Sequence, residues 1–336
     1  MMGELNVALI GCGFIGEVHA RSWSKVKGAK LVAAVDIIEG RAKKLAEDFK
    51  IPHRLTDYTK VLDMKEVDIV DVCTPTYTHK EIAVTAAKSG KHVLVEKPIA
   101  LRLRDADEMI QAAKNAGVKF MVAHVLRFWP EYVEAKRIID SGALGEPRIA
   151  RAYRQSSFPE WALWHKDRRL SGGVFVDMSI HDVDWLRWAL GEVEEVYARG
   201  GTLKTRDATT HDYTHAILKF KNGAIAYVDG SWIQPPGFPF TTYLEIVGTR
   251  GMLTVDNQSP AAVRVCRPGA PPAAFTPFEE DGYDKEVKHF YECVVEDKEP
   301  AVTGEEARRT LEVVLAGLKS VDEGKPVRLP LTGEVL

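Results

Sequence analysis

An apolar run followed by three regularly spaced glycines lies near the start of the chain: Leu5-Asn6-Val7-Ala8-Leu9-Ile10-Gly11-Cys12-Gly13-Phe14-Ile15-Gly16. In a Gly-x-Gly-x-x-Gly pattern the first glycine permits a tight turn and the second lets a ligand approach the backbone. The third allows a helix to pack closely on the strand. The N–H groups at the start of that helix attract negative charge. The stretch therefore predicts a strand, a turn and a helix that bind a dinucleotide pyrophosphate.

An acidic residue follows at the distance that this type of site requires. Asp36 closes the next apolar run about 20 residues later, where a carboxylate can hold the hydroxyls of an adenosine ribose. Its charge would repel a 2′-phosphate, which favours NAD, but Arg41 is near enough in sequence to keep NADP open. The alternative is a structural turn and an unrelated aspartate. The residues expected to contact the cofactor here are Gly11, Gly13, Phe14, Ile15, Gly16 and Asp36.

Short apolar runs alternate with helical patterns through the first part of the sequence. This order is typical of βαβ units that build a parallel sheet. The runs are nearly continuous in apolar residues, as strands covered by helices on both faces are. Residues 1–123 are therefore predicted to form an α/β doubly wound (Rossmann) domain. Its strands are expected at Leu5–Ile10, Lys30–Asp36, Ile69–Cys73, His92–Glu96 and Val118–Ala123.

The pattern then changes, and residues 124–336 are predicted to form an α+β domain with a large, mainly antiparallel open sheet. Asn222-Gly223, between Tyr213–Phe220 and Ala224–Ser231, predicts a hairpin with a type I′ turn. Apolar residues lie on both faces of this hairpin, so one face can pack on helices while the other needs a cover. We expect a second copy to supply it, giving a dimer or tetramer. Helices are expected near Pro130–Ser141 and Val176–Ala189.

Charge and cysteine content exclude several classes of protein. The 336 residues include 45 Lys and Arg against 48 Asp and Glu, a formal net charge of −3. A near-neutral chain gives no reason to expect nucleic acid or an anionic membrane as partner. No apolar run approaches the roughly 18 residues that a spanning helix needs. The four cysteines lack CxxC spacing and indicate buried reduced thiols, so we expect a cytoplasmic protein without a metal centre.

Two further motifs follow expected strands of the first domain. In open α/β sheets ligands lie beyond the carboxyl ends of the strands. Cys73-Thr74-Pro75-Thr76 is such a strand end, and His79 after it either lines the cofactor or caps its helix. In Glu96-Lys97-Pro98, the lysine can donate hydrogen bonds to a substrate oxygen, although alone it could be a surface lysine. Further residues expected to contact the cofactor are Thr74, Pro75, His79, Glu96 and Lys97.

A third motif lies in the second domain: Ser171-Gly172-Gly173-Val174-Phe175-Val176-Asp177-Met178-Ser179-Ile180-His181. Asp177 and His181 are four residues apart and hence neighbours on one helix face. A carboxylate orients an imidazole, which suits a group that takes a proton from an alcohol as hydride leaves the carbon. The alternative is a solvated ion pair. Two metal-binding alternatives lack the spacing of recognised sites: His181 with Asp182 and Asp184, and His211 with His215.

Together these motifs resemble the Gfo/Idh/MocA family of sugar and polyol oxidoreductases, over essentially the whole chain. The glycine-rich turn, Glu96-Lys97-Pro98 and the Gly-Gly-x-x-x-Asp-x-x-x-His run at 172–181 follow the family's order and approximate spacing. The stretch Asp177–Asp184 is most similar to the myo-inositol dehydrogenase branch. Two stretches depart from the common pattern: Ser171 stands where many members have glycine, and Ala123–Phe128 replaces an Asn-Arg-Arg-like run.

The resemblance implies an NAD-dependent dehydrogenase that transfers hydride from a secondary hydroxyl of a cyclic polyol or sugar to nicotinamide. It implies His181 as acid/base, Lys97 hydrogen-bonded to the reacting oxygen, and Asp177 orienting the histidine. Because Lys97 and His181 belong to different predicted domains, the site is expected in a cleft between them. Side chains that could contact the substrate are His124, Arg127, Arg154, Trp164 and Tyr243.

Two other functions stay open at this point. Some members of the family hold NAD tightly and oxidise transiently, so that a glycosidic bond is eliminated and the cofactor returns unchanged; the motifs do not separate this hydrolase from a dehydrogenase. Other proteins of this fold are cofactor-sensing regulators without chemistry. A regulator would not need Lys97, Asp177 and His181, so their presence favours an enzyme.

Overall fold

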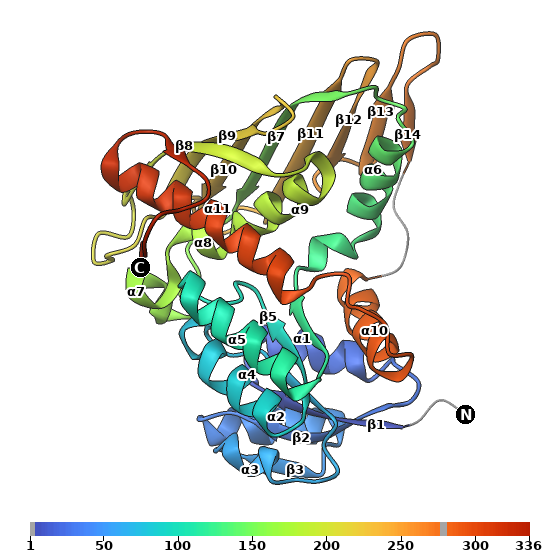
Figure 1. The fold of residues 1–336 in the computed structure, drawn as a ribbon, viewed down its shortest axis with the longest axis vertical. Helices are drawn as coiled ribbons and strands as arrows, with labels where there is room; N and C mark the ends of the chain where they lie inside the picture. Colours follow the sequence, from blue (N-terminus) through green and yellow to red (C-terminus); the bar gives the residue numbers. More distant parts are fainter. Residues whose placement is uncertain (1–3, 276–280) are drawn as a thin grey trace. The chain divides into compact units, whose positions relative to one another are not determined.

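The computed structural model describes residues 4–275 and 281–336, which fall into two compact units (Figure 1). The first comprises the chain up to Val125 together with Asp281–Arg308. The second begins at Leu126 and includes Arg309–Leu336. The segment Asp281–Arg308 thus groups with the first unit, although it follows most of the second in sequence. No helix within the described ranges has the length and hydrophobicity needed to cross a membrane.

A six-stranded parallel sheet in the order β3-β2-β1-β4-β5-β6 forms the centre of the first unit. This confirms the predicted Rossmann sheet, with the unpredicted short strand β3 at its edge. Its strands are β1 (Leu5–Ile10), β2 (Ala29–Val35), β3 (His53–Leu55), β4 (Ile69–Val72), β5 (His92–Glu96) and β6 (Phe120–Ala123). The helices between them are α1 (Phe14–Trp23), α2 (Glu39–Phe49), α3 (Thr59–Leu62), α4 (His79–Lys88) and α5 (Leu103–Ala116).

Helix α10 (Gly282–Val295) packs against α1 and completes the first unit. Lys25, just beyond α1, bonds Asp284 at 2.7 Å from Nζ to Oδ2. Gly28 lies so close to α10 that an added Cβ would stand 2.1 Å from the Tyr291 hydroxyl oxygen. This late segment therefore covers an α1 face that the strand pattern of the first 123 residues leaves without a partner.

The second unit contains a nine-stranded sheet in the order β14-β13-β12-β11-β7-β10-β9-β8-β15. Among these strands only β7 and β10 pair in parallel, which confirms the mainly antiparallel prediction. The strands are β7 (Pro147–Gln155), β8 (Val193–Gly201), β9 (Tyr213–Phe220), β10 (Ile225–Ser231), β11 (Thr241–Gly248), β12 (Gly251–Asp256), β13 (Val263–Cys266), β14 (Ala273–Phe275) and β15 (Val327–Arg328). Its helices are α6 (Pro130–Asp140), α7 (Arg168–Ser171), α8 (Val174–Asp177) and α9 (Ile180–Leu190), with α11 (Gly304–Glu323) beginning in the first unit.

The β9–β10 hairpin forms as predicted, but its turn is not type I′. Gly223 has φ of +85°, whereas Asn222 is not among the residues with positive φ. The Gly223 N–H donates to the Phe220 carbonyl at 3.0 Å, as in a type I turn followed by a left-handed glycine. The Asn222 amide explains the difference, because it donates to the Leu190 carbonyl at 2.7 Å and accepts the Ala224 N–H at 3.0 Å.

The two faces of the large sheet have different surroundings. Helices α9 and α11 lie along one face (Figure 1). Burial alternates along β9, where every second residue from Thr214 to Phe220 is buried. The opposite face exposes apolar side chains, with Ile149, Ile217 and Ile225 between 41% and 49% exposed. The sheet therefore has one helix-covered face and one open face.

Candidate active site

The glycine-rich turn joins β1 to α1, and its three glycines have different surroundings. Gly11 has φ of +98°, and a Cβ there would lie 2.5 Å from the Cys73 carbonyl oxygen. At Gly16 a Cβ would lie 1.9 Å from the Gly11 carbonyl oxygen, so the chain itself requires both glycines. Gly13 has nothing within 4 Å of an added Cβ, and no side chain caps α1. Open space therefore lies before the helix N-terminus, as a bound pyrophosphate requires.

Asp36 lies directly after β2 and is tied to the same turn. Its Oδ2 accepts the Cys12 N–H at 2.9 Å, and its Oδ1 accepts the Ile38 N–H at 2.8 Å. The carboxylate is half-buried, whereas Ile37 and Ile38 beside it are 89% and 47% exposed. Burial raises the pKa of the Cys12 thiol to about 12, so it is neutral beside the carboxylate. This arrangement fits a ribose-binding carboxylate at the end of the second strand.

His79 links two loops at the carboxyl edge of the sheet. Its Nδ1 lies 2.9 Å from the Pro98 carbonyl and its Nε2 lies 2.8 Å from the Thr74 carbonyl. The residue is 1% exposed, and burial lowers its pKa. The alternative that it caps its own helix is wrong, because no side chain caps α4. His79 therefore holds the Thr74-Pro75 loop beside the turn that carries Lys97, and direct contact between its ring and a cofactor stays a prediction.

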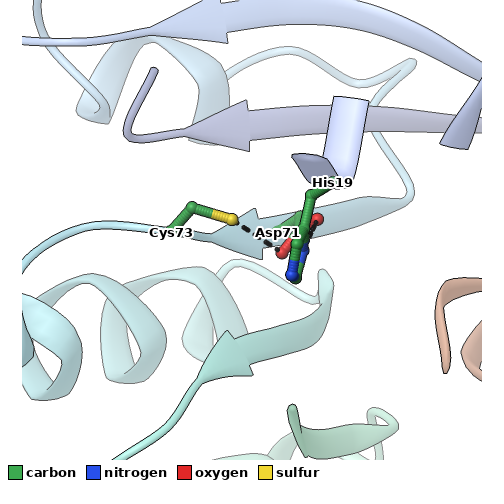
Figure 2. Close-up of side chains that lie close together, drawn as sticks. All are labelled: His19, Asp71 and Cys73. Carbon is green, nitrogen blue, oxygen red and sulfur yellow. Dashed lines mark hydrogen bonds and ion pairs between the residues drawn. The ribbon is translucent and has the colours of Figure 1, made fainter. Parts of the chain in front are cut away.

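The sequence analysis did not identify a buried polar network that includes His19, Asp71 and Cys73 (Figure 2). His19 of α1 places Nδ1 2.9 Å from Asp71 Oδ2 and Nε2 3.1 Å from Glu96 Oε1. Trp23 Nε1 donates to the same Asp71 oxygen at 2.7 Å. Asp71 is the signal that could have revealed the network, because an acid inside a fully buried strand requires partners.

Among the described residues, one group of three has donor atoms close enough to hold a metal ion: His19, Asp71 and Cys73. Neither metal-binding alternative from the sequence is such a group. His211 lies before β9, with its pKa lowered by burial, and the exposed His215 lies 2.6 Å from the Tyr227 hydroxyl. Asp182 and Asp184 form ion pairs with arginines, as described below.

Two consecutive glycines turn the chain into α8. Gly172 and Gly173 have φ of +72° and +83°. A Cβ on Gly172 would lie 2.7 Å from Val176 Cβ, and one on Gly173 would lie 2.5 Å from Thr210 Oγ1. Only glycine fits this double turn, which sets the start of the helix that ends at Asp177.

The single helix predicted near Val176–Ala189 is wrong, because the structure divides it into α8 and α9. The Met178 and Ser179 N–H groups both donate to the Val174 carbonyl, at 2.9 and 3.1 Å. The Ser179 bond spans five residues, which widens the helix locally. Asp177 thus ends one helix and His181 lies in the first turn of the next, so the regular-helix argument for their contact does not hold.

The structure places another histidine beside Asp177. His165 Nε2 lies 3.5 Å from Asp177 Oδ2, and the Trp164 ring stacks on His165 with centroids 3.9 Å apart. Ser171, the serine at a position that is glycine in many family members, donates to the His165 carbonyl at 3.1 Å and accepts the Gly173 N–H at 3.1 Å. The sequence analysis did not identify His165, because it lies 12 residues before Asp177, and α7 and the Gly172-Gly173 turn between them give no sequence spacing that predicts the contact.

Two arginines that are predicted to contact substrate form ion pairs with carboxylates of α9. Arg127 and Arg154 are 7% and 3% exposed. Arg127 Nε and Nη2 both lie 2.8 Å from the Asp184 oxygens. Arg154 Nε and Nη2 lie 3.0 and 2.9 Å from the Asp182 oxygens. Burial opposes the charge of Arg154, but Asp182 more than compensates, so the pKa of Arg154 rises and its guanidinium group stays charged in the ion pair.

Two other predicted substrate contacts, His124 and Tyr243, belong to different units. His124 is buried in the first unit directly after β6. Tyr243 stacks on Tyr153, with centroids 4.8 Å apart, and pairs with it across β11 and β7. Arg154 is the next residue along β7 and therefore points to the opposite face.

Two family models match the chain. One, described as "Oxidoreductase family, NAD-binding Rossmann fold", matches residues 5–124. The other, "GFO/IDH/MocA C-terminal domain", matches residues 132–254. Fold and site thus define an oxidoreductase with an NAD-binding Rossmann domain. The chain belongs to the Gfo/Idh/MocA family, as predicted from its motifs.

Similar proteins cover nearly the whole chain. The scyllo-inositol 2-dehydrogenase (NAD(+)) of Bacillus subtilis is 33% identical, covering 98% of this chain and 97% of the relative. The myo-inositol 2-dehydrogenase of Thermotoga maritima is 31% identical, covering 97% and 98%. An oxidoreductase from Agrobacterium radiobacter, solved with NAD+, L-tartaric acid and magnesium, is 26% identical with a TM-score of 0.87, covering 97% and 98%. These likenesses confirm the predicted fold.

We expect Gly173→Ala to destabilise the second unit, because the Gly173 backbone has φ of +83° and ψ of −178°, a region that other residues avoid. Strain of about 1–3 kcal/mol is expected, and thermal unfolding followed by circular dichroism will measure it. Gly40→Ala is the control, because Gly40 lies in α2 with nothing within 4 Å of an added Cβ. Equal melting temperatures for the two variants would contradict this account.

Proposed function

We propose that this protein oxidises a secondary hydroxyl of a cyclic polyol or sugar, of the inositol type, using NAD. One observation carries the proposal: Lys97, Asp177 and His181 occur together in a chain 31% to 33% identical, over nearly its full length, to two proteins named as inositol dehydrogenases. The polar side chains at the Rossmann strand ends and at the α8–α9 junction support it.

The residues that would hold NAD surround the first turn of the Rossmann unit. The pyrophosphate would lie at the N-terminus of α1, in the space open at Gly13, and the adenosine ribose would bond Asp36. When bound, NAD supplies the hydride acceptor, nicotinamide C4. The loops after β4 and β5 would line the nicotinamide half, with Thr74, Pro75, Glu96 and Lys97.

Proton transfer is assigned to side chains of the protein. His181 takes the proton of the reacting hydroxyl, and the Lys97 ammonium donates a hydrogen bond to the same oxygen as negative charge develops on it. Asp177 helps to orient the groups around it, and its 3.5 Å approach to His165 supports this role. Lys97 belongs to the first unit and His181 to the second.

Replacing either proton-handling residue is expected to reduce turnover while the cofactor still binds. Lys97→Ala and His181→Ala should each lower kcat by about 10²–10⁴-fold, because positioned acid–base groups contribute that much. Steady-state NADH production measures turnover, and calorimetric titration with NAD measures binding. Wild-type turnover in the His181 variant would refute the assignment.

A screen for NADH production over inositols, aldoses and sugar acids tests the substrate class. Net NADH accumulation with a cyclic polyol or sugar would support the dehydrogenase. If a glycoside is cleaved without NADH accumulating, the NAD-retaining hydrolase is the correct function. If none of these compounds is oxidised or cleaved and NAD still binds, an unrelated substrate class or a cofactor-sensing regulator replaces the proposed function.

The Asp36 carboxylate is expected to select NAD against NADP, because a 2′-phosphate would lie against its negative charge. Asp36→Asn is the suitable variant, since its amide oxygen can still accept one of the two N–H bonds that Asp36 receives. It should raise the NADP-to-NAD ratio of kcat/KM by about 10-fold or more. A tenfold change corresponds to removing about 1.4 kcal/mol of repulsion between the carboxylate and the 2′-phosphate. Lys43→Gln, at an exposed position on α2, is the control. An unchanged ratio would refute the role of Asp36.

A second copy of the chain is the proposed cover for the open face of the nine-stranded sheet. Ile149 and Ile225 are cross-strand neighbours, as are Ile217 and Tyr227. All four lie on that face, and the three isoleucines are 41% to 49% exposed. A continuous patch of this kind typically marks a protein interface, and a self-complementary one gives a symmetric oligomer.

A charge placed in this patch is expected to separate the copies. Ile217→Glu should lower the mass in solution towards the 37.4 kDa of one chain, because an unpaired charge would be buried in the interface. Light scattering after size-exclusion chromatography measures the mass. Ile37→Glu is the control, since Ile37 is 89% exposed but lies in the other unit. A wild-type protein that is monomeric would refute the interface.

A further inference from the structure

The buried network of His19, Asp71 and Glu96 has no part in the proton transfer described above. His19 projects from α1 with its side chain fully buried. Its two ring nitrogens lie 2.9 Å from Asp71 Oδ2 and 3.1 Å from Glu96 Oε1. Figure 2 shows the Asp71 side of this contact. Asp71 lies within β4 and Glu96 ends the neighbouring strand β5, so the ring connects both strands to α1.

Hydrogen-bond chemistry determines the charge of the ring. An ionised carboxylate only accepts, and a neutral imidazole donates from one nitrogen alone. Two carboxylate oxygens facing the two nitrogens are both satisfied by an imidazolium cation. Burial opposes that charge, but Asp71 outweighs it, and the pKa of His19 lies well above its usual value. The other titratable groups facing the ring are Cys73, Glu96 and Tyr283.

Glu96 extends this connection to the residue proposed to hold the reacting oxygen. Its Oε1 faces His19, and its Oε2 accepts the Lys97 backbone N–H at 2.9 Å. We propose that His19 is a positioning residue that acts through Glu96 to fix the backbone from which the Lys97 side chain extends. This inference rests on the proposed function, in which the Lys97 ammonium bonds the substrate oxygen.

A metal ion is the competing use of the same atoms, because His19, Asp71 and Cys73 could each offer a ligand within 4.8 Å of the others. The contacts favour the hydrogen-bonded network. Asp71 Oδ2 already receives His19 and Trp23, and Cys73 Sγ donates to Asp71 Oδ1 at 3.5 Å. Burial raises the pKa of the Cys73 thiol, which disfavours the thiolate that a metal needs.

Two amide variants of His19 test its two hydrogen bonds one at a time. The Asn amide nitrogen stands near the position of Nδ1, so His19→Asn keeps a donor towards Asp71 and loses the one towards Glu96. The Gln amide nitrogen stands near Nε2, so His19→Gln keeps the donor towards Glu96. We expect His19→Asn to lower kcat by about 10–100-fold, as displacement of a catalytic group does, and His19→Gln to recover most of that loss.

The assay uses NAD and the fastest substrate of the inositol and aldose panel, with KM, NAD affinity and melting temperature measured beside kcat. Trp23→Phe is the matched control, because it removes a bond to Asp71 and leaves the Glu96 contact intact. It should lower the melting temperature without lowering kcat. The effects of His19→Asn and Glu96→Gln on kcat should not add, because both interrupt the same connection.

Equal kcat losses in His19→Asn, His19→Gln and Trp23→Phe would overturn the proposal, because the network would then be only structural. If His19→Asn does not fold, Glu96→Ala replaces it, and wild-type kcat in that variant would also overturn the proposal. Stoichiometric zinc in the purified protein, by elemental mass spectrometry, would favour the metal site instead. If Lys97→Ala keeps full turnover, the proposed function fails. If Lys97→Ala loses turnover but His19→Asn keeps it, only the positioning role of His19 fails.

Discussion

The first unit depends on the close approach of helix α1 to the end of β1. At Gly16 the helix backbone lies so near the Gly11 carbonyl that a Cβ would stand 1.9 Å from its oxygen. This approach holds the N-terminus of α1 at the carboxyl edge of the sheet, where Gly13 leaves open space. Three residues beyond Gly16 the same helix places His19 between Asp71 of β4 and Glu96 of β5. One steric constraint therefore positions both the glycine-rich turn and the buried His19, which contacts Glu96 beside Lys97.

The sequence predicted features whose determinants lie close together in the chain. The strand–turn–helix unit, Asp36 and the strand ends before Thr74 and Lys97 follow from glycine spacing and alternating apolar runs, and the structure has them in the expected order. The Gly172-Gly173 pair is of the same kind, because the backbone geometry that it permits is local. Patterns of this type also identified the family, since its motifs are short segments in a fixed order.

Features that depend on distant residues could not be predicted in this way. Asp71 and Glu96 lie 52 and 77 residues from His19 in the sequence, so no local pattern predicts either contact. The turn at Asn222 was assigned from its neighbour Gly223, but the Asn222 side chain bonds Leu190, 32 residues away, and takes another geometry. Helix α8 ended early for a similar reason: a Cβ on Gly230 of β10 would lie 2.0 Å from Ser179 Oγ, so the break packs closely against the sheet.

The paired arginines of the second unit constrain the chemistry that it can offer. Separating a buried ion pair costs about 3–5 kcal/mol, because it leaves a charge without a partner. A substrate carboxylate would therefore have to displace Asp184 from Arg127 or Asp182 from Arg154, and both are bidentate. The polar groups beside the α8 break are instead a carboxylate and imidazoles: Asp177, His165 and His181. Such groups exchange hydrogen bonds with hydroxyls, which is the chemistry that the proposed function needs.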